Sequence, residues 1–144
     1  LGPNEDYVLV NETGMGRVHR LWLKGERAGE QDVFIDELPG TPDNIRFDGE
    51  NTFWIAMPSL RASLDSLASL PRLRALLAFL PIPWLEAAAQ PASFVIGVNL
   101  EGEVVHNLQD QDNPFHYITG VTPCGDALYL GSLETETIGI LPKP

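Results

Sequence analysis

The chain has 144 residues, of which 44% are hydrophobic and 20% are charged, a composition typical of one globular domain. Nine basic residues stand against 20 acidic ones, and the formal net charge of −11 argues against a nucleic-acid partner. Cys124 is the only cysteine, which excludes an internal disulfide and a thiolate metal cluster. No signal peptide and no apolar run of ~20 residues is visible, so the compartment stays undetermined.

The first part of the chain predicts five short strands. Residues 1–6 resemble an internal turn rather than a natural start. Apolar or alternating runs bounded by turn residues then follow at 7–10, 17–23, 32–36, 45–47 and 53–57. The last two runs flank Asp48-Gly49, which is a typical hairpin turn. A turn at Gly40-Thr41-Pro42 precedes them, because glycine frees the backbone and proline fixes it.

The second part of the chain predicts five more strands, at 93–99, 103–108, 117–121, 127–131 and 137–141. Strands at intervals of about ten residues are typical of sandwiches, barrels and propellers. A weak internal repeat, in which 44–47 and 53–56 resemble 118–121 and 128–131, favours a propeller. The last unit has three predicted strands and no fourth before Pro144. The fold class is therefore all-β, a partial β-propeller domain over residues 1–144.

One segment, residues 59–92, interrupts this pattern with an alanine- and leucine-rich composition. Leu60, Leu64 and Leu67 lie on one face of a predicted helix, and Pro71 separates it from a second helix. The segment is thus predicted to be a helical hairpin insertion. Such a hairpin could pack on its own fold, or it could act as a lid, a partner surface or an interfacial membrane contact.

Asp43 and Asn44 stand together at the start of a predicted inner strand. Their oxygen atoms could bind a cation such as calcium, or their side chains could simply cap the turn. Among the histidines, His116 precedes another inner strand together with Tyr117 and could reach a central pocket. His19 and His106 lie within predicted strands and are interpreted as structural.

These residues resemble the strictosidine synthase-like proteins of the adipocyte plasma membrane-associated type. The resemblance runs through 11–13, 17–25 and 38–45, and it includes the insertion and the closing segment 128–133. It implies a six-bladed β-propeller related to gluconolactonases and paraoxonases. This chain would supply about half of that propeller, the C-terminal half.

The resemblance also bears on the site. Asp43 and Asn44 resemble the adjacent pair that binds the catalytic calcium in paraoxonases, whose other ligands come from earlier blades. Thr119 occupies the position of the glutamate that true strictosidine synthases use, and threonine cannot serve as that acid or base. Pictet–Spengler condensation is therefore not expected. Pro123-Cys124 replaces the family's usual Glu-His before the last hairpin.

Two hypotheses for the function follow. The first is calcium-assisted hydrolysis of an ester or lactone in a completed propeller, with Asp43 and Asn44 as metal ligands and His116, Tyr117 and Thr119 as candidate catalytic residues. The second is a non-catalytic half-propeller for assembly or small-ligand binding. Since the strands amount to about two and two-thirds blades and propellers usually have 4–8, we expect a homo-oligomer or a missing N-terminal half as partner.

Overall fold

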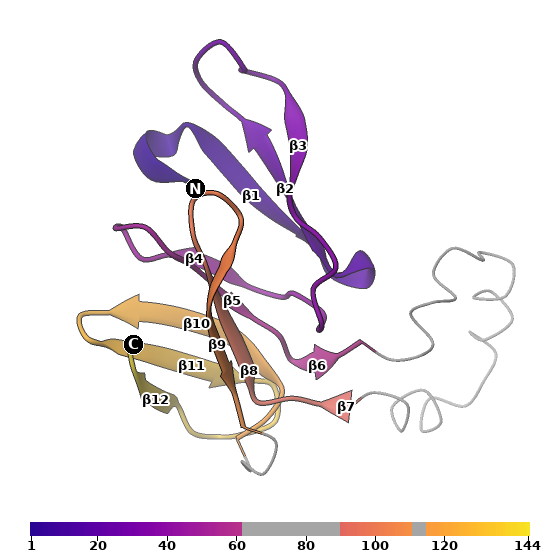
Figure 1. Cartoon of the computed structure of the whole chain (residues 1–144). Helices are drawn as coiled ribbons and strands as arrows, with labels where there is room; N and C mark the ends of the chain where they lie inside the picture. The colour runs from indigo at the N-terminus through magenta and orange to yellow at the C-terminus, as the bar shows by residue number, and fades with distance from the viewer. Residues whose placement is uncertain (62–89, 111–114) are drawn as a thin grey trace, which may run out of the picture.

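The computed structural model of the chain describes residues 1–61, 90–110 and 115–144 (Figure 1). Nearly all of its regular structure is strand. The elements are η1 (Pro3–Glu5), β1 (Tyr7–Glu12), η2 (Thr13–Met15), β2 (Arg17–Trp22), β3 (Gln31–Ile35), β4 (Ile45–Phe47), β5 (Phe53–Ala56), β6 (Ser59–Leu60), β7 (Gln90–Pro91), β8 (Phe94–Val98), β9 (Val104–Gln109), β10 (Ile118–Cys124), β11 (Ala127–Ser132) and β12 (Gly139–Pro142).

Three antiparallel sheets follow one another in chain order, β1-β2-β3, β4-β5-β8-β9 and β10-β11-β12. In Figure 1 they succeed each other from the top of the view to the bottom. Each sheet is an antiparallel meander, and in the second the short β6-β7 ladder is inserted between β5 and β8. Such meanders are how propeller blades are built. The chain is therefore a partial all-β propeller, as the sequence predicts, and the last blade has three strands within the described residues.

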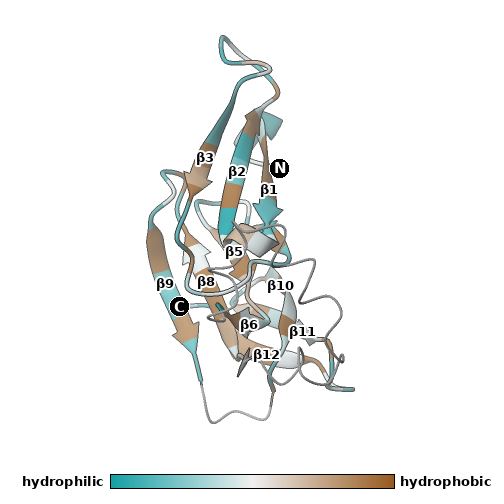
Figure 2. Ribbon diagram, turned by 90° about the vertical axis from the view of Figure 1, so that its right-hand side faces the viewer, coloured by the Kyte–Doolittle hydropathy of each residue, from teal (hydrophilic) through white to brown (hydrophobic). Residues whose placement is uncertain are grey.

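The position of β5 in the middle blade explains why residues 53–57 form a continuous apolar run. Every residue of β5 and β8 is buried, because neighbouring blades cover both faces of this sheet. Phe53 and Ile55 belong to the core shared with the first blade, whereas Trp54 and Ala56 belong to the core shared with the third. Figure 2 shows β8 brown over most of its length, whereas β2 alternates between brown and teal.

The two outer blades bury only one face. In the third blade Leu128 is fully buried, whereas Tyr129 and Ile140, which pair across β11 and β12, are 41% and 66% exposed. In the first blade Leu9 is buried and its neighbour Val10 is 51% exposed. The alternation of strand side chains thus leaves an apolar face at each end of the three-blade stack.

The boundaries of the insertion differ from the helical prediction. Ser59–Leu60 and Gln90–Pro91 pair as the antiparallel strands β6 and β7. The prediction that Leu60 lies in a helix is therefore wrong. The remainder of the predicted hairpin, residues 62–89, lies outside the described residues. In the part of the chain that the structure describes, no helix has the length and hydropathy needed to cross a membrane.

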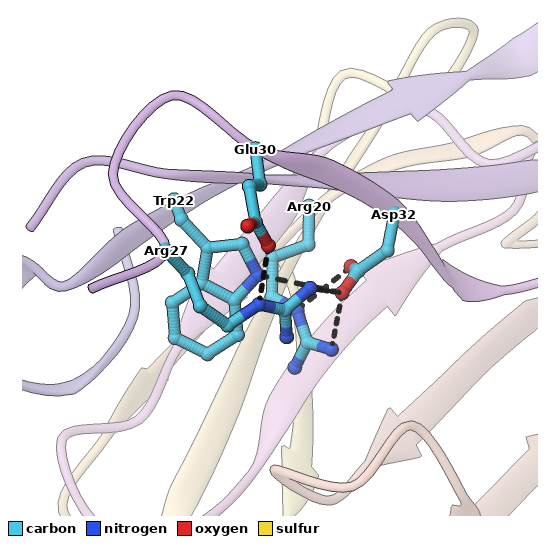
Figure 3. A network of polar contacts seen from close by, with 5 residues as sticks. All are labelled: Arg20, Trp22, Arg27, Glu30 and Asp32. Carbon is cyan, nitrogen blue, oxygen red and sulfur yellow. Dashed lines mark hydrogen bonds and ion pairs between the residues drawn. The ribbon is translucent and has the colours of Figure 1, made fainter. Parts of the chain in front are cut away.

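A charged cluster ties β2 to β3 in the first blade (Figure 3). Arg20 donates two hydrogen bonds to the Asp32 carboxylate, at 2.9 and 3.0 Å. Arg27 and the indole N–H of Trp22 also donate to Asp32, at 2.9 and 3.3 Å. Both guanidinium groups lie over the Trp22 ring, 4.6 and 4.5 Å from its centroid. The cluster holds the outer hairpin of this blade together.

Candidate functional site

Asp43 and Asn44 lie at the entry of β4, beside the end of β5. The backbone N–H of Asp43 donates to the carbonyl of Ala56 at 2.9 Å, and the N–H of Ala56 donates to the carbonyl of Asn44 at 3.0 Å. These two bonds continue the β4-β5 ladder, so the backbone of the pair is fixed. Both residues keep more than a third of their surface exposed, although the surrounding chain partly covers them. The placement matches the sequence prediction that the pair heads an inner strand.

Asn44 also joins the second blade to the third. Its backbone N–H and its side-chain Nδ2 both donate to the carbonyl oxygen of Thr119, at 3.3 and 2.7 Å. The β10-β11 register slips by one residue at Thr119, as in a β-bulge. Thr119 is the extra residue of this bulge and has no partner on β11. Its carbonyl oxygen is therefore free of the β10-β11 ladder and accepts the hydrogen bonds from Asn44. Since the donor side of the carboxamide is held by Thr119, its oxygen is left as an acceptor.

Asn11, at the end of β1, is the residue that the sequence analysis missed. Its Nδ2 donates to the carbonyl oxygen of Asp43, which brings the first blade to the same place. Its Oδ1 is buried and accepts no hydrogen bond from any described residue. An orphaned buried acceptor is unusual in a native fold. No sequence pattern distinguishes Asn11 from other residues at strand ends. Its proximity to Asp43, 32 residues further along the chain, is visible only in the folded structure.

The electrostatics at Asp43 favour a positively charged partner. Partial burial raises the pKa of its carboxyl above the ordinary value, because desolvation disfavours the charged form. No hydrogen bond or ion pair from the described residues reaches this carboxylate. Asn11 is hydrogen-bonded to the backbone of Asp43, and Asn44 follows Asp43 in the chain. All three residues carry side-chain oxygen atoms, which are the ligands that a hard cation such as calcium prefers.

The fit to calcium is incomplete in this chain. Calcium takes 6–8 oxygen ligands, and three side chains cannot supply them alone. Within residues 1–61, 90–110 and 115–144, no group of three or more His, Cys, Asp or Glu residues could hold a metal ion. Water or further protein groups would have to complete the shell.

His116 and Tyr117 lie at the entry of β10. The sequence predicts a strand that begins at Tyr117, but β10 begins one residue later, at Ile118. The φ of Tyr117 is 51°, which places this residue in the left-handed region and not in a strand. The turn is held by Ser132, whose hydroxyl donates to the carbonyl of His116 at 2.7 Å. The His116 ring lies 3.2 Å from a carboxylate oxygen of Glu134. No hydrogen bond or ion pair joins His116 or Tyr117 to Asp43 in the described part of the chain.

The other candidate side chains have local partners. His19 lies 2.7 Å from Glu12, and His106 stacks on Trp54 with ring centroids 5.2 Å apart. Cys124 ends β10 and is exposed.

Searches against known proteins place these observations in context. No family model matches the chain. The rat adipocyte plasma membrane-associated protein is 32% identical over 145 residues, which cover 96% of this chain and 39% of the relative. Strictosidine synthase-like 6 of Arabidopsis thaliana is 36% identical, over 92% of this chain and 35% of the relative. The human adipocyte plasma membrane-associated protein is 32% identical, over 94% of this chain and 34% of the relative.

The chain thus spans between 34% and 39% of the length of these curated relatives. The alignments cover between 92% and 96% of this chain. Nearly all of the chain is thus similar in sequence to strictosidine synthase-like proteins, and its three blades fit the partial propeller that this similarity implies.

Proposed function

We propose that this chain supplies the cation-binding face of a strictosidine synthase-like propeller that hydrolyses a small ester or lactone. The observation that carries the proposal is the orphaned Oδ1 of Asn11, whose side chain contacts Asp43. A buried acceptor without a partner, on a residue hydrogen-bonded to the backbone of an unpaired and partly desolvated aspartate, favours a bound cation. The net charge of −11 also favours cations at this surface.

The residues of this chain have separate parts in the proposal. Asp43 would supply negative charge, and Asn11 and Asn44 would supply neutral oxygen ligands. The carbonyl of Thr119 keeps the carboxamide of Asn44 in one orientation through the hydrogen bond that it accepts from Nδ2. Calcium, when bound, would act as a Lewis acid on the substrate carbonyl.

The test is a melting experiment with calcium and with a chelator. A ligand that binds only the folded state stabilises it by about 2.7 kcal/mol at a concentration 100 times its Kd. With an incomplete ligand set we expect a Kd of about 0.1–1 mM, as in weak extracellular sites. Asp43→Asn should abolish the calcium-dependent shift in melting temperature. Asp126→Asn, which removes an exposed carboxylate from a turn, is the matched control and should keep the shift.

Affinity should also depend on pH. Protonation of Asp43 competes with calcium, and its raised pKa moves that competition to higher pH than for an ordinary aspartate. Identical melting curves for the parent protein with calcium and with chelator would sink the proposal. Calcium binding without turnover of an aryl acetate or a γ-lactone would instead favour a non-catalytic module.

Assembly is a second candidate function, favoured by the apolar outer faces. Ile138 and Ile140 on the third blade are 71% and 66% exposed, and Val10 and Val33 on the first are 51% and 46% exposed. Exposed apolar patches and unpaired sheet edges recruit further protein. A second copy of the chain, or the missing part of a longer propeller, would cover them. Light scattering at micromolar concentration tests this, and a stable monomer would contradict self-association.

A further inference from the structure

A cavity of about 400 Å³ lies between the second and third blades, and its described lining does not include Asn11, Asp43 or Asn44. Its volume falls in the range of about 300–1,000 Å³ that is usual for small-molecule sites. Both of its walls belong to sheets of this chain. The cavity is therefore a candidate ligand site that is separate from the candidate cation site.

The deep part of the cavity belongs to the apolar core that the two blades share. Val95, Ile118 and Leu130 line it and are 1%, 3% and 8% exposed. Leu108 and Leu141 also line it but are only partly buried, so they lie nearer to its opening. Leu108 is paired with Val95 across β8 and β9, which puts both side chains on the same face of the second blade. A molecule that enters between the blades therefore buries its surface against aliphatic side chains.

Phe115 is joined to both blades beside this cavity. Its carbonyl oxygen accepts a hydrogen bond from the hydroxyl of Ser93, directly before β8. Its ring packs on β12, where a Cβ added to Gly139 would lie only 3.0 Å from a ring carbon. Both Ser93 and Phe115 line the cavity. These contacts fix the spacing of the two sheets, so the cavity is formed before a ligand arrives, as small-molecule sites usually are.

The polar residues of the lining have partners within the chain. The Ser93 hydroxyl donates to the Phe115 carbonyl, and Nε2 of Gln109 donates to Oδ1 of Asn107 at 2.6 Å. Both carboxamide residues are exposed and stay in contact with water. Asp110 is the one charged residue among the described residues of the lining, and it has an interaction of its own. Burial of apolar surface, rather than a bond to a polar group, is therefore the main contribution of this cavity to binding.

We propose that this cavity binds a small apolar molecule, such as an aromatic compound or a medium-chain alcohol. The apolar body lies between the two blades against Val95, Ile118 and Leu130, and a polar substituent stays at the opening, in water. Recognition depends on the apolar area that the molecule buries. Affinity therefore rises about fourfold for each methylene group added to a ligand that fits the cavity.

The experiment uses the whole chain with a chelator present, so that its result is independent of the candidate cation site. Nile red, an uncharged apolar dye, serves as the fluorescent probe, and we expect saturable binding of one dye per chain. Octanol should displace the dye at a concentration about 15-fold lower than hexanol does, because it buries two more methylene groups. Absence of saturable binding, or displacement by both alcohols at the same concentration, would overturn the proposal.

Two neighbouring residues of β12 give a matched pair of variants. Leu141 lines the cavity, whereas Ile140 lies on the opposite face and is 66% exposed. Leu141→Trp should fill the cavity and raise the Kd for Nile red at least tenfold. Ile140→Trp should change it less than twofold. Equal effects would assign the dye to the outer face instead and refute the cavity as its site.

A second pair covers the case in which Leu141→Trp does not fold. Leu108→Trp narrows the opposite wall, and Val105→Trp changes a 48% exposed residue of the same strand outside the cavity. Urea unfolding first checks that both variants are as stable as the parent protein to within about 1 kcal/mol. Dye binding should weaken in Leu108→Trp and persist in Val105→Trp. Unchanged binding in a folded Leu108→Trp variant would contradict the proposal.

Discussion

Asp32 should be the charged residue of the first blade that contributes most to stability. Hydrogen bonds from Arg20, Trp22 and Arg27 lower the pKa of Asp32 from 3.8 to about 2, with the largest effect from Arg20 and against the opposing effect of burial. One pKa unit corresponds to about 1.4 kcal/mol, so the shift corresponds to roughly 2 kcal/mol at most. The Asp32 and Arg20 side chains retain 28% and 19% exposure, and solvent screening reduces the figure to about 1–2 kcal/mol.

The perturbation is Asp32→Asn, measured by urea unfolding with circular dichroism. At pH 7 the variant should lose about 1–2 kcal/mol, or about 3–6 °C in Tm. Because the folded pKa lies below the unfolded one, the contribution of Asp32 is complete above pH ~4 and falls as the pH drops toward 2. The difference between parent and variant should be about half its neutral value near pH 3.

An exposed ion pair in the same blade provides the control. Lys24 and Glu5 lie 3.6 Å apart with side chains 55% and 67% exposed, so Glu5→Gln should change stability by less than about 0.5 kcal/mol. If the two variants lose the same stability, or if the loss in Asp32→Asn does not shrink in acid, the reasoning from the Asp32 network is wrong.

Three further predictions concern turns and chemistry. Gly102 has a φ of +90°, and a Cβ there would lie 2.2 Å from a carbonyl oxygen of β3, so Gly102→Ala should cost at least ~2 kcal/mol by urea unfolding. Gly125→Ala, with a φ of +57° and no atom within 4 Å of the added Cβ, should cost only about 1 kcal/mol. One carboxylate oxygen of Asp48 accepts hydrogen bonds from three backbone N–H groups of the β4-β5 turn. Asp48→Ala should therefore reduce the free energy of unfolding by about 2–4 kcal/mol and lower Tm, whereas Glu50→Gln should change it by less than ~0.5 kcal/mol. The sequence resemblance places Thr119 where true strictosidine synthases have a glutamate, so we expect no condensation of tryptamine with an aldehyde. A stereospecific product above the buffer rate would contradict this.

The sequence by itself determined the strands, the hairpin turns and the propeller class. These features depend on local patterns, since side-chain alternation and turn residues such as Asp48-Gly49 act over a few residues. The apolar run at 53–57 can also be read from the sequence alone. Continuous apolar residues are typical of a strand that is buried on both faces, as in a central blade. The placement of Asp43 and Asn44 at the head of an inner strand belongs to this group.

Only the tertiary structure decided what surrounds that pair. Asn11 meets Asp43 across 32 residues and Thr119 meets Asn44 across 75, and no local pattern encodes such contacts. The register slip that frees the Thr119 carbonyl depends on how β10 pairs with β11. The short β6-β7 ladder arises because folding brings the two ends of a long insertion together, although the insertion as a whole has a composition that favours helix. The physical reason is the same in each case: contacts between residues far apart in the sequence, rather than local preference, set these features.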